Sequence, residues 1–145
     1  MINATQNVAN RLNPYAPTAL SLFRVIVGLL LLCHATAHLF GWPSGPAAGV
    51  GQWPYFYAGC VELVAAVLIT LGLFTRIAAF IAAGTMAFAF FTQHLPTGLV
   101  PMTNGGELAV LYCFAFLLLI FTGGGTVALD ARLHGTSRPA RVDAS

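Results

Sequence analysis

Four long runs of apolar residues dominate this chain of 145 residues and limit the folds that it can adopt. A helix needs about 20 apolar residues to cross the hydrocarbon core of a bilayer, and the runs approach or reach that length. Backbone groups in lipid must find hydrogen-bond partners within their own segment, so each run predicts a helix. The four predicted spans, residues 19–40, 56–74, 77–95 and 107–121, together predict an all-α, integral-membrane four-helix bundle.

The composition supports a membrane protein and argues against a soluble domain. Only 7% of the residues are charged and 58% are hydrophobic, whereas a soluble domain carries roughly 25% charged residues. The net charge of +2 is too weak and too scattered to indicate nucleic-acid binding. The length predicts one transmembrane domain over residues 19–130, preceded by a cytoplasmic segment (1–18) and followed by a flexible cytoplasmic tail (131–145).

All six basic residues are arginines, and all lie on one predicted side of the membrane. The two loops on the other side, residues 41–55 and 96–106, contain no Lys or Arg. By the positive-inside rule both termini are predicted to be cytoplasmic (N-in/C-in) in the plasma (inner) membrane. The arginines precede or begin the first span, occupy the turn between the second and third, and follow the fourth: Arg11, Arg24, Arg76, Arg132, Arg138 and Arg141.

Ionisable residues gather near the predicted outer ends of all four spans. His34 and His38 lie on one face of the first span, because residues four apart are neighbours on a helix. Glu62 lies about two turns inside the second span, His94 ends the third and Glu107 begins the fourth. We therefore expect one polar site in the outer leaflet. Its predicted catalytic residues are His34, Glu62, His94 and Glu107, and its predicted cofactor-binding residues are His34, His38, Glu62 and His94.

Each of these residues also has a structural explanation. Asn104 and Glu107 fit a capping box at the start of the fourth span. A carboxyl group within a transmembrane helix is a functional candidate by default, but Glu62 is also compatible with a buried structural hydrogen bond. His38 lies close enough to the interface to reach water, and His94 precedes a Leu-Pro pair at which a helix is expected to end.

On the inner side, Arg24 begins the first span and Asp130 follows the fourth. The simplest interpretation of a basic and an acidic residue at one depth is a structural ion pair. The sequence therefore predicts a pair between Arg24 and Asp130 with no part in catalysis.

Four motifs, in order along the chain, resemble the DoxX family and cover nearly all of residues 20–130. They are RVIVG at 24–28 with His34 and HLFG at 38–41, ELVAAVLITLGLFTR at 62–76, NGGELAVLY at 104–112, and GGGTVALD at 123–130. The chain departs from the family pattern at Ala35, where glycine is usual, and at His38, where lysine is frequent. A role that depends on a fixed cation at position 38 therefore does not transfer to this chain.

The resemblance implies a four-helix membrane protein that is often linked to redox chemistry. The family is named for a subunit of thiosulfate:quinone oxidoreductase. Other members are associated with oxidative-stress defence and with sulfur or thiol metabolism, often beside soluble redox partners. Fold transfers more safely than function, because function depends on the site.

Three functions follow as hypotheses. The first is a quinone-interacting redox subunit, in which histidines and a membrane glutamate exchange protons. The chain has no nucleotide fingerprint, P-loop or CxxC pair, so this function needs a soluble or membrane redox partner or a bound cofactor. The aromatic residues predicted either to line a quinone slot or to make plain lipid and core contacts are Trp53, Tyr57, Phe88, Phe90 and Phe91.

The second hypothesis is a metal or haem site built from the same His and Glu residues, although their spacing matches no recognised metal motif. The third is a membrane scaffold or a small transporter. Small residues in the third span, such as Ala78 and Ala82, allow close helix contact within the bundle or between the copies of a homo-oligomer. The lipid bilayer is a predicted partner in every case.

Overall fold

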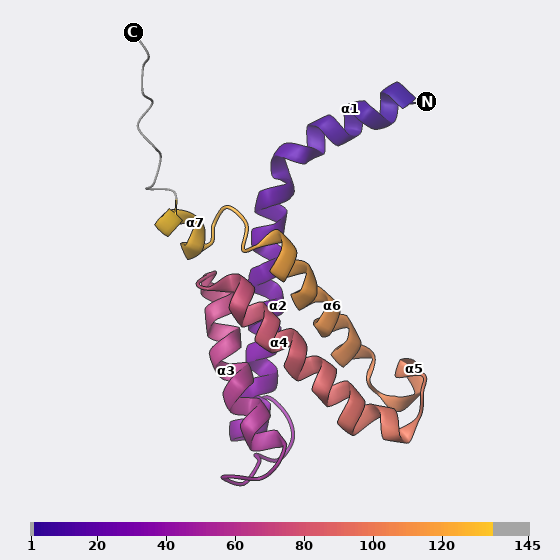
Figure 1. The fold of residues 1–145 in the computed structure, drawn as a ribbon, viewed down its shortest axis with the longest axis vertical. Coiled ribbons are helices and arrows are strands. Elements are labelled where there is room, and N and C mark those ends of the chain that lie inside the picture. Colours follow the sequence, from indigo (N-terminus) through magenta and orange to yellow (C-terminus); the bar gives the residue numbers. More distant parts are fainter. Residues whose placement is uncertain (1, 135–145) are drawn as a thin grey trace.

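The computed structural model describes residues 2–134, and every regular element in that range is helical (Figure 1). The four long helices match the predicted spans closely: α2 (Ala16–Phe40), α3 (Tyr55–Leu71), α4 (Thr75–Ala89) and α6 (Glu107–Thr122). Most of the predicted tail, with Arg138 and Arg141, lies outside the described residues. The shorter elements are α1 (Ile2–Leu12), η1 (Asn13–Tyr15), η2 (Phe90–His94), η3 (Leu95–Thr97), α5 (Pro101–Asn104) and α7 (Leu129–His134).

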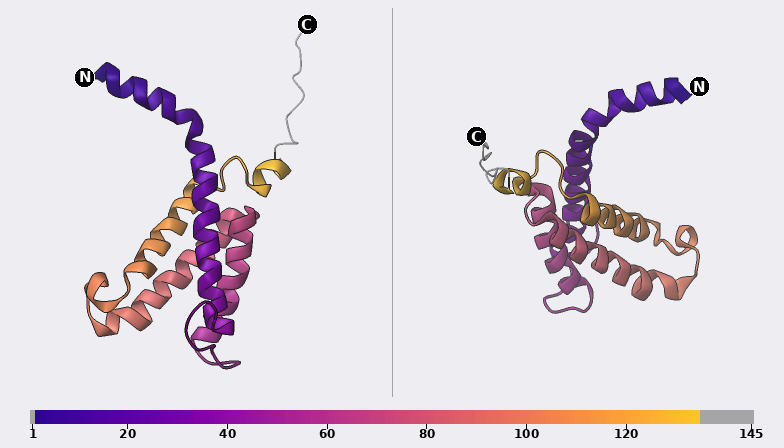
Figure 2. Two further views of the ribbon diagram at one scale, coloured as in Figure 1. Left: turned by 180° about the vertical axis from the view of Figure 1, so that it is seen from behind. Right: turned by 45° about the horizontal axis from the view of Figure 1, so that its top comes forward.

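The long helices form two hairpins, α2 with α3 and α4 with α6, which are joined by packing between α3 and α4. At one end, here called the terminal end, lie α1, α7 and the tight turn at residues 72–74. At the opposite end, here called the loop end, lie the loop of residues 41–54 and the segment from η3 to α5. Figures 1 and 2 show that the two hairpins meet at the terminal end and diverge towards the loop end.

Glycines and one carboxylate fix the helix ends at the terminal end. Gly72 adopts a left-handed conformation, with φ of 71°, and ends α3. The Asp130 carboxylate accepts hydrogen bonds from the backbone N–H groups of Phe74 and Thr75, both at 2.8 Å. This carboxylate therefore caps the start of α4 and ties the 123–130 segment to it.

Small residues bring the helices close together. The α4 residues Ala78, Ala79, Ala82 and Ala83 are all buried in the core, as their small size favours. On α2, Gly28 lies so close to α3 that a Cβ atom there would be 3.0 Å from the Thr70 backbone nitrogen. These contacts close the interior at the terminal end.

Arg24 is buried, at 2% exposure, and points into the junction between α3 and the 123–128 segment. Its Nε donates to the Gly124 carbonyl oxygen at 2.8 Å, and its Nη1 donates to the carbonyl oxygens of Ile69, at 2.6 Å, and Thr70. The predicted ion pair between Arg24 and Asp130 therefore stays a prediction: the hydrogen bonds of Arg24 go to backbone carbonyl groups, and the Asp130 carboxylate accepts from the backbone N–H groups of Phe74 and Thr75. A carbonyl-rich helix end satisfies a buried guanidinium without a carboxylate.

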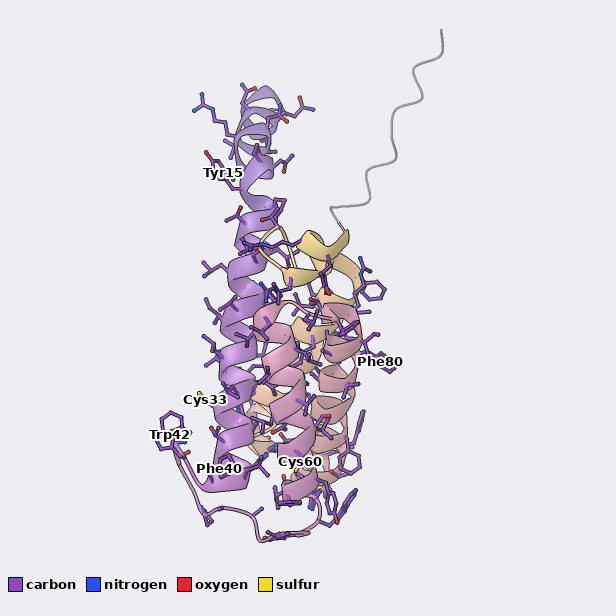
Figure 3. The ribbon with its side chains drawn as sticks, turned by 90° about the vertical axis from the view of Figure 1, so that its left-hand side faces the viewer. Tyr15, Cys33, Phe40, Trp42, Cys60 and Phe80 are labelled. Carbon is purple, nitrogen blue, oxygen red and sulfur yellow. The ribbon has the colours of Figure 1, made fainter. Side chains whose placement is uncertain are left out.

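The outside of the bundle is apolar on all four long helices. Such continuous exposure of large apolar side chains is unusual for a soluble monomer and marks a surface that contacts lipid or protein. In Figure 3, Phe80 lies on this surface between Tyr15, towards the terminal end, and Trp42 and Phe40 at the loop end. The exposed residues include Leu22, Ile26, Leu29, Val61, Val64, Val67, Ile77, Phe80, Ile81, Leu111, Phe114 and Leu118.

Two helical stretches are long and apolar enough to cross a bilayer, Thr5–Phe40 and Thr75–Thr97. The helices α3 and α6 are apolar but shorter, with 17 and 16 residues. An all-helical chain with this surface is typical of a helical membrane protein.

Candidate functional site

A cavity of about 310 Å³ lies at the loop end, where the two hairpins diverge. All four long helices contribute to its lining, and so does the π-helical turn η2. The structure brings together four of the five predicted site residues around this cavity: His34, His38, Glu62 and His94. We call it the central cavity.

His38 and Glu62 form the polar centre of the cavity. Nδ1 of His38 lies 3.1 Å from Oε2 of Glu62, which is buried at 2% exposure. An ionised carboxylate can only accept, so Nδ1 donates to it and Nε2 is left as the exchangeable nitrogen of the ring. Gly59 allows this contact, because a Cβ atom there would lie 3.0 Å from the Cβ of His38.

His34 lies one turn deeper on α2 and faces Tyr112 of α6. The two rings meet edge to face with centroids 5.5 Å apart, and Tyr112 also stacks on Phe116 at 5.9 Å. Among the residues that the structure describes, neither the His34 imidazole nor the Tyr112 hydroxyl has a hydrogen-bond partner. Both groups line the cavity and are therefore open to a ligand.

His94 reaches the cavity from the π-helical turn η2. Its Nδ1 donates to the Asn104 carbonyl oxygen at 3.1 Å, which fixes the ring and leaves Nε2 available. The neighbouring Gln93, also in η2, accepts a hydrogen bond from the hydroxyl of Tyr55 on α3 at 3.1 Å. Single π-helical turns of this kind occur frequently at functional sites.

Glu107 does not line the cavity. It is the first residue of α6 and is exposed. The predicted capping box is also wrong, because Gly106 is the N-cap residue and no side chain caps the helix. Asn104 instead ends the short helix α5 and accepts a hydrogen bond from the Gly106 N–H at 2.8 Å.

The polar residues of the lining that the sequence analysis missed include Tyr55, Gln93 and Tyr112. Tyr112 stands alone as a polar-tipped ring within an apolar span, and that was a usable signal. Gln93 could have been found as the neighbour of His94. Nothing in the sequence marked Tyr55 as different from the other aromatic residues near the membrane interface.

The aromatic residues expected in a slot divide between several places. Phe88 lines the central cavity, whereas Trp53 and Tyr57 pack beside it on the outside of α3 and α4. Phe90 and Phe91 pack against each other edge to face, at 5.6 Å. Within residues 2–134, no group of three His, Cys, Asp or Glu side chains is arranged to hold a metal ion.

Comparison with known proteins agrees with this architecture. The DoxX family model matches residues 19–95, which contain most of α2, all of α3 and α4, and the residues His34, His38, Glu62 and His94. A protein of Haemophilus influenzae, described as an uncharacterized protein, is 40% identical over 127 residues, covering 83% of this chain and 95% of its own length. No solved structure matches the chain significantly. With more than half of its length matched by the family model, this chain belongs to the DoxX family.

Proposed function

We propose that this DoxX protein crosses the inner membrane four times, with both termini in the cytoplasm, and that its central cavity binds a quinone as part of a redox system. The apolar exteriors of all four long helices support the membrane placement. Aromatic residues enriched at membrane interfaces flank that surface, with Tyr15 at one end and Trp42, Trp53 and Tyr57 at the other. The arginine distribution supports placing the terminal end in the cytoplasm.

The single observation that carries the quinone proposal is the His38–Glu62 pair inside a largely apolar cavity. Small-molecule sites are mostly apolar clefts of about 300–1,000 Å³ with a few converging polar groups, and the central cavity has this character. The flat ring of a quinone fits between apolar walls such as Met86, Phe88 and Leu108. Its two carbonyl oxygens need hydrogen-bond donors, which His38 offers to one oxygen and His34 with Tyr112 to the other.

Reduction of a bound quinone to the quinol takes up two electrons and two protons. Within this chain, the doubly protonated His38 ring can deliver the proton on Nε2 to one quinone oxygen, while the Glu62 carboxylate at Nδ1 stabilises the protonated ring. Water then returns a proton to the same nitrogen, and water also supplies the second proton of the quinol. Tyr112 and His34 would hold the opposite carbonyl oxygen. The electrons must come from a redox partner, because this chain carries no nucleotide or CxxC motif.

The closed interior on the other side of the cavity supports a binding site over a transporter. Between the cavity and the terminal end the core is filled by buried side chains, namely Leu31, Ile69, Ala79, Ala82, Phe116 and Leu119. The cavity therefore ends blindly within the membrane. A metal or haem site and a non-catalytic scaffold remain as the competing functions that the experiment must separate.

The test is a quinone titration of the purified protein in mild detergent, with thermal stability as the readout. A ligand that binds only the folded state raises the melting temperature in a saturable way. We expect such a rise for the wild type and for Glu107→Gln, which makes the same chemical change outside the cavity. The rise should fall by at least half in Glu62→Gln and in His34→Gln.

Two other outcomes would count against the proposal. If the wild type shows no rise and both cavity variants are simply less stable, the polar cluster is structural and the scaffold function takes first place. If Glu62→Gln keeps the full rise, the quinone binds elsewhere. A Soret band or a stoichiometric metal in the purified protein would favour the metal or haem function instead.

A further inference from the structure

A second hollow, of about 390 Å³, lies on the outside of the bundle between α3 and α4. Its apolar walls come from Val61 on α3 and from Ile81 and Phe88 on α4, and Trp53 and Tyr57 border its loop end. We call it the α3/α4 groove. Both of its helices belong to the apolar exterior, so in the proposed placement it opens sideways into the lipid.

The α3/α4 groove and the central cavity share a wall. Four residues line both of them: Pro54, Ala58, Thr85 and Phe88. Three of these four are small or rigid, and the Thr85 hydroxyl is engaged with its own helix, donating to the Ile81 carbonyl oxygen at 3.0 Å. Of these four residues, only Phe88 has a ring large enough for a change of rotamer to open or close the wall between the cavity and the groove.

Phe88 is held loosely for such a position. It is 42% exposed and touches Trp53 edge to face at 5.9 Å, and Trp53 is itself exposed and tilted against Tyr57. Beside Phe88 the groove is open, because a Cβ atom at Gly84 would meet nothing within 4 Å. A rotation of the Phe88 ring therefore has free space on the groove side.

The other neighbour of the central cavity has a different character. A hollow under the loop shares His38 and Tyr55 with the cavity and is otherwise formed by residues 44–48, Ala37 and Gln52. Its backbone is held to α2 by a hydrogen bond from the Ala48 N–H to the His38 carbonyl oxygen at 2.7 Å. With Ser44, Gln52 and Tyr55 in its lining, this hollow is more polar than the α3/α4 groove and suits water and proton exchange with His38, whereas the groove suits hydrocarbon.

We infer that the α3/α4 groove binds the isoprenoid tail of the quinone whose ring occupies the central cavity, and that the ligand enters from the membrane past Phe88. This inference rests on the proposed function. The volume of the central cavity, about 310 Å³, is near the lower limit of small-molecule pockets and suits a quinone ring. A long tail must therefore extend out of the cavity. The groove is the apolar space that continues the cavity into lipid.

The test separates the tail from the ring by comparing decylubiquinone with the same benzoquinone ring lacking its alkyl tail. Gly84→Phe fills the groove from α4, and Val61→Phe fills it independently from α3. Leu111→Phe is the control, because Leu111 is exposed on α6 and lines neither space. Binding to the protein in lipid nanodiscs is followed by quenching of Trp53 fluorescence, with Trp42→Phe as the common background.

We expect the dissociation constant for decylubiquinone to rise at least tenfold in Gly84→Phe and in Val61→Phe. The constant for the tail-less quinone should stay within twofold of the background, and Leu111→Phe should change neither. If a groove-filling variant that folds leaves decylubiquinone binding unchanged, or weakens both quinones equally, the groove is not the tail site. If neither quinone binds the background protein, the proposed function itself fails, which is a distinct result.

Discussion

Two buried charged side chains, Arg24 and Glu62, satisfy their need for partners in different ways. Arg24 donates to three backbone carbonyl groups, two in the last turn of α3 and one at Gly124. Among the residues that the structure describes, His38 is the hydrogen-bond partner of Glu62, whose carboxylate otherwise lines the central cavity. Arg24 therefore serves the fold, whereas Glu62 keeps part of its bonding capacity for a ligand or a proton.

Replacement of Arg24 by leucine is predicted to destabilise the protein strongly. Each buried carbonyl group left without a partner costs roughly 1–3 kcal/mol, so we expect a loss of about 2–4 kcal/mol after some relaxation. The measurement is the melting temperature in a fixed detergent. Arg76→Leu is the control, because exposed Arg76 makes one hydrogen bond, to the Ile120 carbonyl oxygen at 2.9 Å. Equal losses in the two variants would contradict the assigned role of Arg24.

At the scale of the elements, α2 and α3 are pressed together at two glycines, one near each end. Because Gly28 has no side chain, Thr70 can pack against α2 near the terminal end. Gly59 likewise lets His38 pack against α3 near the loop end. Gly59 thus sets the separation at which His38 can reach Glu62. The α2–α3 hairpin carries the charged half of the site, and α6 with η2 carries the Tyr112 and His94 half.

Gly28→Ala is predicted to force α2 and α3 apart and to lower the melting temperature. The added Cβ atom would lie 2.5 Å from Thr70 Oγ1 and 3.0 Å from the Thr70 nitrogen, and overpacking of this kind costs about 1–3 kcal/mol. Gly84→Ala is the matched change on α4, where the new methyl group meets nothing. It should be neutral or slightly stabilising, since alanine favours a helix by roughly 0.5–1 kcal/mol over glycine. If Gly28→Ala is equally harmless, the close contact does not control the α2–α3 spacing.

The sequence was sufficient to predict the long helices and four of the cavity residues. Helical geometry fixes the depth and face of His34, His38 and Glu62 once the span boundaries are known, so counting turns was enough. Counting turns could not identify the hydrogen-bond partners of Arg24. Gly124 lies 100 residues away, and its position depends on how the 123–128 segment folds back.

The start of the last long helix was the weakest part of the prediction. The short helix α5 and the left-handed Gly105 place Asn104 before a turn, so the capping-box spacing was present without its geometry. Glu107 consequently faces outwards and not into the cavity. The π-helical turn that orients His94 also left no pattern in the sequence, since it differs from an α-helix by one residue per turn.

At the scale of the whole molecule, the bundle is a wedge that is packed shut at the terminal end and open at the loop end. The proposed orientation points the closed end, with its arginines, to the cytoplasm and the cavity to the outer leaflet. A redox partner that supplies electrons to a quinone in the cavity would then act from the outer side. The orientation therefore decides from which side of the membrane the redox partner acts.

Accessible cysteines can test that orientation directly. In a background with Cys33, Cys60 and Cys113 replaced by alanine, Ser44→Cys places a thiol in the exposed loop of residues 41–54, and Thr126→Cys places one in the exposed terminal-end segment. We expect a membrane-impermeant maleimide to label Ser44→Cys in intact spheroplasts, and Thr126→Cys only after permeabilisation. The reverse pattern would mean that the protein has the opposite orientation, with the cavity in the inner leaflet. Labelling of both thiols in intact cells would mean that the two ends lie on the same side, which four spanning helices of this topology do not allow.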